Sequence, residues 1–238
     1  MRPNLLVVAH PDDETIGLGG QLHAFENLSI VHVTDGAPRS FPAREEHAAV
    51  RRRELLAALG IAGIAPERAT CLGVADQEAS LDLAGLTARI AGLFRELAPH
   101  AVYTHPYEGG HPDHDACAFA VHAACGMVDA PPAIREFTSY HCRGGAMVTG
   151  EFLCARSVTT VLLSRVARAR KQRMIECFRT QRETLRPFRC DAERIRAAPR
   201  YDFSRLPAQE ILYDHYSWGV KSAEWIERAR AALAALCP

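Results

Sequence analysis

The sequence predicts an α/β fold in which a doubly wound, mostly parallel sheet is flanked by helices. Short apolar runs alternate with stretches of helical periodicity in the first half of the chain, and this alternation is typical of βαβ units. Polar clusters follow two of the apolar runs, at the sheet edge where such folds bind ligands. The second half has several short β-rich runs without helices between them, which favours antiparallel additions to the sheet.

Each element is placed by its apolar pattern and by the residues that end it. Apolar runs predict parallel strands at 5–8, 28–34, 70–74 and 101–105. Helical patterns predict helices at 14–27, 44–59, 82–97 and 115–125. After Pro131-Pro132, β-rich segments are expected at 134–141, 152–154 and 158–163. The remainder predicts a long basic amphipathic helix at 165–182, a short aromatic segment at 211–218 and a closing helix at 223–236.

Length and composition fit one domain spanning 1–238, with a core at 1–130 and a β-rich and helical extension at 131–238. The 28 basic and 28 acidic residues balance, which removes a general electrostatic case for nucleic acid or an anionic membrane as partner. No apolar stretch approaches the roughly 20 residues of a membrane span. Because residues 1–4 run into the first strand without a signal-peptide pattern, we expect a cytoplasmic protein.

Several other classes of site are disfavoured. Gly17, Gly19 and Gly20 do not complete a dinucleotide fingerprint, because Leu22 stands where the third glycine should fall. We expect these glycines to allow a close approach of the backbone to the sheet or to a ligand. No G-x-S-x-G elbow occurs. The eight cysteines include no Cys-x-x-Cys pair, so they are expected to be small core residues rather than a thiolate or redox site.

Two clusters of imidazoles and carboxylates carry the chemistry. Ala9-His10-Pro11-Asp12-Asp13-Glu14 follows the first predicted strand, and His111-Pro112-Asp113-His114-Asp115 follows the fourth, so both can meet over one edge of the sheet. Two imidazoles and one carboxylate form the ligand set of catalytic zinc sites. Spacing alone leaves open which of Asp12 and Asp13, and which of His111 and His114, would bind the metal.

Such a metal lowers the pKa of bound water toward about 7 and permits hydrolysis without a side-chain nucleophile. The two groups left over match the base and the oxyanion or leaving-group donor that this chemistry needs. For either cluster alone, a capping turn with Asp as the N-cap of the next helix is the simpler interpretation. Two such turns at strand ends favour the metal site, and the metal content of the purified protein separates the two interpretations.

The two clusters resemble the signature motifs of the PIG-L/LmbE-like deacetylases. The resemblance extends through Gly19-Gly20, the Thr34-Asp35-Gly36 turn, and a later helix with Lys171 and Gln181. It implies a Rossmann-like fold and a zinc-dependent hydrolysis of an N-acetyl group. Carried over by position, it implies the following roles: zinc ligands His10, Asp13 and His114; general base Asp12; His111 to polarise the carbonyl and protonate the leaving amine; Asp113 to orient His111.

The resemblance also implies an arginine, on the helix after the second strand, that holds sugar hydroxyls. Arg51, Arg52 and Arg53 are consecutive there, and we favour Arg53 for its place beside Glu54. Further candidates for the pocket are Tyr107 and His215, the latter in an outer wall with Tyr216 and Trp218; aromatic packing is the alternative for these. Glycine directly before the second motif departs from the thiol-sugar deacetylases and argues against mycothiol or bacillithiol substrates.

These observations predict a zinc hydrolase that removes an N-acetyl group from an N-acetylated amino sugar or glycoconjugate by attack of metal-bound water. One Zn²⁺ per chain is expected, with Fe²⁺ or Co²⁺ as substitutes. The partner would be that small molecule, with no nucleic acid and no membrane span, and a homo-oligomer is left open. One alternative is a zinc amidohydrolase acting on another N-acyl amine or natural-product precursor. The alternative of another class is a non-catalytic sugar- or nucleotide-binding module.

Overall fold

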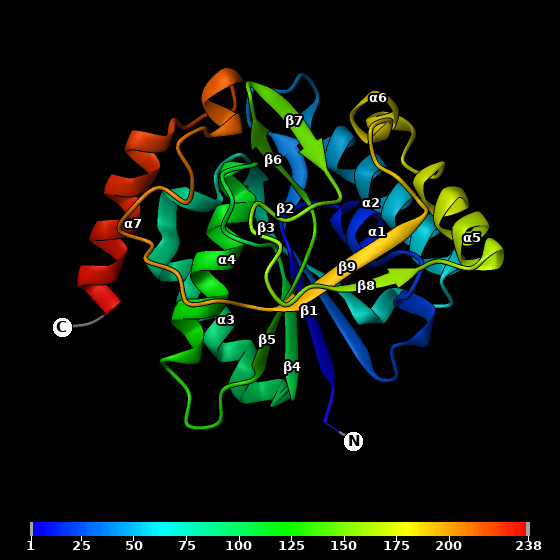
Figure 1. The fold of residues 1–238 in the computed structure, drawn as a ribbon, viewed down its shortest axis with the longest axis horizontal. Helices are drawn as coiled ribbons and strands as arrows, with labels where there is room; N and C mark the ends of the chain where they lie inside the picture. The colour runs from blue at the N-terminus through cyan, green and yellow to red at the C-terminus, as the bar shows by residue number, and fades with distance from the viewer. Residues whose placement is uncertain (1, 237–238) are drawn as a thin grey trace.

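A computed structural model describes residues 2–236, and within them seven strands form one mixed sheet in the order β3-β2-β1-β4-β5-β9-β8 (Figure 1). Its strands are β1 (Asn4–Val8), β2 (Leu28–Pro38), β3 (Ala69–Asp76), β4 (Ala101–Thr104), β5 (Ala133–Phe137), β8 (Thr159–Leu162) and β9 (Ala192–Ala197). Strands β1 to β5 pair in parallel, whereas β9 is antiparallel to both β5 and β8. The expected fold class, a mostly parallel sheet with antiparallel additions, is confirmed.

Helices cover both faces of the sheet, because each central strand is apolar on both sides. Leu5 and Val7 pack into one hydrophobic cluster, whereas Leu6 and Val8 pack into another, as the two-residue period of a strand requires. The first cluster is covered by α3 (Leu83–Leu97), α4 (Pro112–Cys125) and α7 (Ser222–Leu236). The second is covered by α1 (Asp13–Leu18), α2 (Arg44–Ile61) and α5 (Arg165–Ile175).

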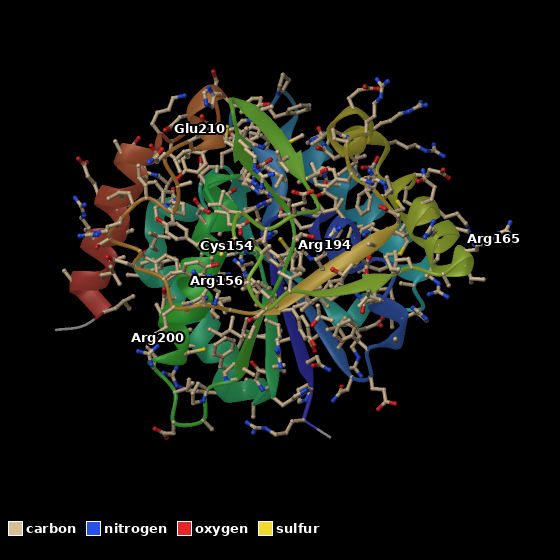
Figure 2. All side chains as sticks on the ribbon, viewed as in Figure 1. Cys154, Arg156, Arg165, Arg194, Arg200 and Glu210 are labelled. Atoms are coloured by element: carbon tan, nitrogen blue, oxygen red, sulfur yellow. The ribbon has the colours of Figure 1, made fainter. Side chains whose placement is uncertain are left out.

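The second half of the chain differs from the sequence-based expectation in its strands. The expected strand at 134–141 divides into β5, which extends the parallel sheet, and β6 (Tyr140–Arg143), which forms a separate hairpin with β7 (Ala146–Thr149). The segment 152–154 is irregular, and β7 and β9 were not expected. Arg194 of β9 donates to the Gly150 carbonyl at 2.6 Å, which ties the end of the hairpin to the sheet (Figure 2).

Two predicted helices are shorter in the structure. The helix expected at 14–27 ends at Leu18, and the one expected at 165–182 ends at Ile175, with a short helix α6 (Arg182–Leu185) after it. Tertiary contacts explain the second difference, because the Glu54 carboxylate accepts hydrogen bonds from the Thr180 N–H at 3.0 Å and from its hydroxyl at 2.6 Å. No helix within residues 2–236 combines the length and apolar character that a membrane crossing needs.

Gly17 of α1 and Gly20, two residues after that helix, allow a close approach to the sheet. A Cβ atom on Gly17 would lie 2.1 Å from the Phe137 ring, and one on Gly20 would lie 2.5 Å from the Leu163 side chain. The backbone of Gly20 donates to the Glu193 carboxylate at 2.8 Å. The helix that follows the first polar cluster is therefore held directly against β5 and β9.

We predict that Gly17→Ala lowers the free energy of unfolding by about 1–3 kcal/mol, because the added methyl group overpacks the contact with Phe137. The matched control is Gly92→Ala on α3, where a Cβ meets open space. There the higher helix propensity of alanine should stabilise the protein by up to about 1 kcal/mol. Urea denaturation measures both changes, and equal stabilities of the two variants would contradict the packing argument.

Candidate metal centre and active site

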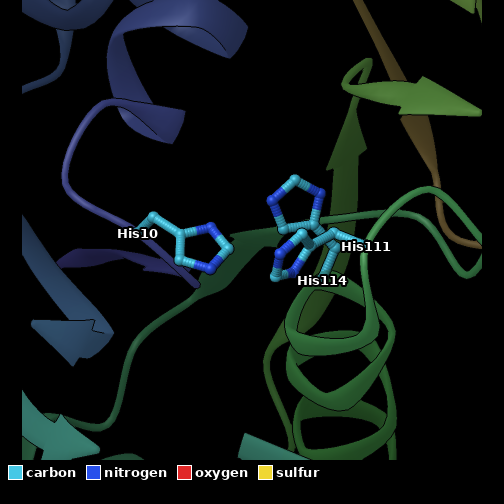
Figure 3. A group of neighbouring side chains, drawn as sticks. All are labelled: His10, His111 and His114. Carbon is cyan, nitrogen blue, oxygen red and sulfur yellow. The ribbon is translucent and has the colours of Figure 1, made fainter. Parts of the chain in front are cut away.

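The turn after β1 and the start of α4 bring the two polar clusters together at the carboxyl edge of the parallel strands. His10, from the β1–α1 turn, faces His111 and His114, from the start of α4 (Figure 3). The ring centroids of His10 lie 4.5 Å from His111 and 5.2 Å from His114. Nitrogens of the three rings all lie within 4.8 Å of one another. The expectation that the clusters meet over one edge of the sheet therefore agrees with the geometry.

The carboxylate of Asp13 joins the two halves of the site. One oxygen accepts the backbone N–H of His10 at 2.7 Å and lies 3.3 Å from the His105 Nε2 atom. The other oxygen lies 3.1 Å from the His114 Nε2 atom. Burial alone would raise the pKa of Asp13, but the imidazoles of His114 and His105 hold it well below its usual range. Asp13 is therefore an ionised carboxylate among imidazole nitrogens.

The donor set fits a zinc ion. The Nε2 atom of His114 is buried and has no hydrogen-bond partner, while its Nδ1 atom lies 3.2 Å from the Ser139 hydroxyl. Metal-binding histidines typically have their second ring nitrogen held in this way while the first is free for the metal. His10, Asp13 and His114 together offer the N and O ligands that zinc prefers. The second-layer contact from Ser139 was not foreseen from the sequence.

Asp76, at the end of β3, is a further member of the site that sequence reasoning missed. One of its oxygens lies 3.1 Å from the His10 Nε2 atom, and the Asp113 carboxylate lies 3.2 Å from the same nitrogen. Burial lowers the pKa of His10, but the neighbouring carboxylates of Asp76, Asp113 and Asp13 together raise it well above the usual value. Asp76 is the last residue of a third parallel strand, and this position is the sequence signal that could have identified it as a site residue.

Asp12 combines a strained backbone with a buried side chain. Its φ of 140° is a conformation that L-residues rarely adopt, and such strain tends to persist at functional sites. A side-chain oxygen lies 3.0 Å from an amino group of Arg51. Burial raises the pKa of Asp12 to about 8, because Arg51 offsets only part of the cost of burying this carboxylate beside Asp13.

Asp113, which was expected to orient His111, contacts that residue through its backbone N–H rather than through its carboxylate. Its carboxylate accepts hydrogen bonds from the Gln77 N–H at 2.6 Å and the Ala79 N–H at 3.0 Å, and contacts His10 rather than His111. The backbone N–H of Asp113 instead donates to the His111 Nδ1 atom at 3.2 Å. Burial lowers the pKa of His111 to about 3. The neutral His111 ring then carries its proton on Nε2, because its Nδ1 atom accepts the Asp113 N–H.

A cavity of about 320 Å³ adjoins these groups. It is lined by His10, Asp12, Asp13, Asp76 and His111. Arg51, Gln77, Tyr216 and Trp218 also line it, and the centroid of the Trp218 ring lies 4.7 Å from that of the His111 ring. The rest of the lining mixes apolar and polar side chains: Ile16, Tyr140, Met147, Leu185, Pro187 and Phe188 together with Gln181, Glu183 and Thr184. The arrangement places most of the polar cluster in a cavity large enough for a small molecule.

Three residues expected in the pocket lie elsewhere. Arg53 is exposed on the outer face of α2, and Arg51 takes the place in the cavity. Tyr107 is buried in an aromatic core beside Trp225, with its hydroxyl donating to the Arg205 carbonyl at 2.9 Å. His215 is exposed and outside the cavity lining, whereas Tyr216 and Trp218 line it as expected.

Residues 5–125, just over half of the chain, match the sequence model of the PIG-L family, described as GlcNAc-PI de-N-acetylase. The chain belongs to the PIG-L family. The match includes both polar clusters and the strands that position them. The structure therefore shows how a PIG-L sequence assembles these clusters at one edge of its sheet.

Known deacetylases are similar to this chain in sequence or in structure. The chain is 33% identical over 141 residues to a 1D-myo-inositol 2-acetamido-2-deoxy-alpha-D-glucopyranoside deacetylase from Rhodococcus jostii (strain RHA1), covering 46% of this chain and 48% of that protein. The chain thus spans about half the length of this curated relative. A deacetylase of teicoplanin biosynthesis has a TM-score of 0.65 at 21% identity, over 84% of this chain and 99% of that one. An N,N'-diacetylchitobiose deacetylase from Pyrococcus horikoshii has a TM-score of 0.64 at 20% identity, over 83% and 84%. At these identities the two structures show a shared fold.

We predict that zinc binding releases at least one proton near neutral pH and strengthens as the pH rises. The carboxylates around His10 raise its pKa, so it is protonated at neutral pH, and an imidazole must lose its proton to bind zinc. Calorimetry in two buffers of different ionisation enthalpy measures the protons released. Asp76→Asn, which removes one of the carboxylates on His10, should release fewer protons. A zinc affinity that is unchanged between about pH 6 and 8 would contradict this assignment.

Proposed function

We propose that this chain is a zinc-dependent hydrolase that removes the acetyl group from an N-acetylated amino sugar or glycoconjugate. The observation that carries the proposal is the convergence of His10, Asp13 and His114 beside Asp12 and His111, of which all but His114 line one cavity. This set contains a candidate metal site, a base and a donor within one enclosure, which are the groups that amide hydrolysis requires.

His10, Asp13 and His114 would hold the metal ion. When bound, zinc would supply a water molecule with a pKa near about 7 and a Lewis acid for the amide carbonyl. The chain's own residues would do the rest. Asp12 is next in sequence to a ligand and is held by Arg51 at 3.0 Å, so it can take a proton from the attacking water.

His111 would supply the proton donor for the leaving group. Its Nδ1 atom accepts a hydrogen bond from the Asp113 N–H. The neutral ring therefore carries its proton on the Nε2 atom, from which it can be donated. As the C–N bond breaks, that proton can pass to the departing amine nitrogen. The water oxygen and its second proton remain with the acyl carbon as acetic acid, which loses that proton to solvent. The proton that Asp12 took from the water replaces the one that His111 gave up, so the products are acetate and a free amine.

The cavity wall and the relatives favour an amino sugar. Trp218 presents an aromatic face beside His111, and Arg51, Asp76 and Gln77 add polar groups to the same cavity. An aromatic face with hydrogen-bonding groups around it suits a sugar ring, which has apolar C–H faces and hydroxyl edges. The family description and the names of two relatives, a 2-acetamido-2-deoxy-glucopyranoside deacetylase and an N,N'-diacetylchitobiose deacetylase, support this class.

A second candidate is the same hydrolysis on a less polar N-acyl amine or a natural-product precursor. The apolar side chains of Ile16, Leu185 and Phe188 in the cavity lining favour this second candidate, because burying apolar ligand surface against apolar side chains is favourable. Acetate release from a panel that contains N-acetylglucosamine derivatives with polar and with alkyl or aryl aglycones, together with simple N-acetyl amines, separates the two candidates. Acetate release from amines without a sugar would favour the second.

We predict that Asp12→Asn keeps zinc but lowers turnover by about 100-fold or more, which is the scale of a general base. Asp13→Ala and His10→Ala should instead lose zinc and activity together, because each removes a ligand. Elemental analysis and acetate release on the same samples, before and after chelation, provide the measurement. A zinc-replete Asp12→Asn variant with full activity would contradict the mechanism.

We predict that Arg51→Ala lowers turnover at least tenfold, whereas Arg53→Ala stays within about twofold of the parent. Arg51 is buried and donates to the Pro11 carbonyl at 2.8 Å as well as to Asp12; its loss would leave the Asp12 carboxylate without its buried cation. Arg53 lies on the same helix but is exposed, so it is the matched control. Steady-state kinetics measure both, and equal losses would contradict the structural assignment of Arg51.

A further inference from the structure

The two signature clusters leave the carbonyl oxygen of the scissile amide without a hydrogen-bond donor of its own. The Nδ1 atom of His111 is occupied by the Asp113 N–H, so His111 has one proton to offer, and the leaving amine requires it. Arg51 directs its two amino groups to Asp12 and to the carbonyls of Pro11 and Gly36. The carbonyl oxygen, which becomes negatively charged when water attacks, is therefore left without a donor from these groups.

Tyr140 brings a free hydroxyl to this place. It is the first residue of β6 and lines the cavity. Its ring centroid lies 5.0 Å from the His114 ring and 5.9 Å from the Phe188 ring. No hydrogen bond joins the hydroxyl to any residue in the described range 2–236, although the ring is well packed. Packing alone would be served equally by a phenylalanine, so the hydroxyl is free to bind a molecule in the cavity.

The backbone around Tyr140 is held firmly in this position. A Cβ atom on Gly110 would lie 2.0 Å from the Tyr140 carbonyl oxygen, so glycine lets β6 lie directly against the loop that precedes His111. The preceding residue, Ser139, accepts the Gly150 N–H through its carbonyl at 3.1 Å and contacts His114 through its hydroxyl. Neighbouring residues of one segment thus contact a predicted metal ligand, one through its hydroxyl and the other through its ring.

We propose that Tyr140 is a further catalytic residue, whose hydroxyl donates a hydrogen bond to the carbonyl oxygen of the scissile amide as that oxygen becomes an oxyanion; this inference rests on the proposed hydrolase function. The water oxygen forms a bond to the carbonyl carbon, and the π electrons of the C=O bond move to its oxygen. When the C=O bond re-forms, the C–N bond breaks and the amine takes its proton from His111. Tyr140 keeps its own proton throughout.

The chemistry of the phenol suits this role. A phenol ionises only near about pH 10, so the group is a neutral donor at working pH. A neutral donor adds no charge to a cavity that already holds the ionised Asp13. Donors placed where charge develops are worth about 100-fold or more in turnover when removed.

The test compares Tyr140→Phe with the parent and with a matched control, Tyr103→Phe. Tyr103 lies on β4 outside the cavity, with its ring against Phe25, so its variant removes a phenol oxygen away from the site. We expect Tyr140→Phe to keep its zinc and its KM within about twofold and to lose about 100-fold in kcat for acetate release. A kcat within about threefold of the parent would overturn the proposal.

A second readout separates this inference from the proposed function. Acetate, as the product, places carboxylate oxygens where the amide oxygen would lie, and calorimetry on the zinc-loaded protein measures its binding. Tyr140→Phe should weaken acetate binding about tenfold, as expected for one hydrogen bond to a charged group. If the parent hydrolyses no amide of the panel, the proposed function fails, whereas acetate binding still shows whether the Tyr140 hydroxyl binds a charged oxygen in the cavity. Equal acetate affinities of parent and variant, or no acetate binding by the parent, would overturn the proposed role of Tyr140.

Discussion

The functional end of the protein depends on how the buried carboxylate of Asp13 is compensated. An ionised carboxylate without partners in the interior is very costly, and Asp13 is surrounded by the His10 N–H and by the rings of His10, His105 and His114. His105 also accepts the Ala9 N–H at 3.1 Å and stacks on His114 at 3.8 Å. Because these partners follow β1, follow β4 and lie on α4, a single charge links the turn, the sheet edge and the helix that form the site.

Buried ion pairs perform a similar task for the antiparallel part of the sheet. Lys171 of α5 pairs with Glu193 of β9 at 2.7 Å and also donates to the Ile16 carbonyl. Arg196 of the same strand pairs with Glu136 of β5 at 2.8 Å and contacts Glu108 at 3.3 Å. Such pairs add little net stability relative to apolar packing, but removing one partner is strongly destabilising. They therefore act here chiefly to fix which strands and helices lie together, including the loop that leads to His111.

The features that sequence reasoning predicted are those specified locally. Both polar clusters follow apolar strands, so their meeting follows from the parallel topology. Arg51 was missed because the place of Arg53 beside Glu54 was weighed above helical phase: Arg51, Leu55 and Leu59 repeat every four residues and share the buried face of α2. Strand β9 was missed because Glu193 and Arg196 interrupt its apolar pattern, and only their distant partners make burial tolerable. The position of Tyr140 is set by Gly110 and by the turn between β5 and β6, contacts that no local pattern encodes.

The electrostatics of the cluster explain how the chain can fold before it binds a metal. Asp12, Asp13, Asp76 and Asp113 place four carboxylates around His10, and Arg51 is the nearby permanent cation. The groups whose pKa values rise are His10 and Asp12, so protons on these two residues offset the excess negative charge. A divalent cation among the same atoms would take over that role and favour the loss of both protons. Asp12 must lose its proton before it can act as a base. Metal binding and activation of this base are therefore coupled, because the charge of the metal ion would favour the loss of that proton.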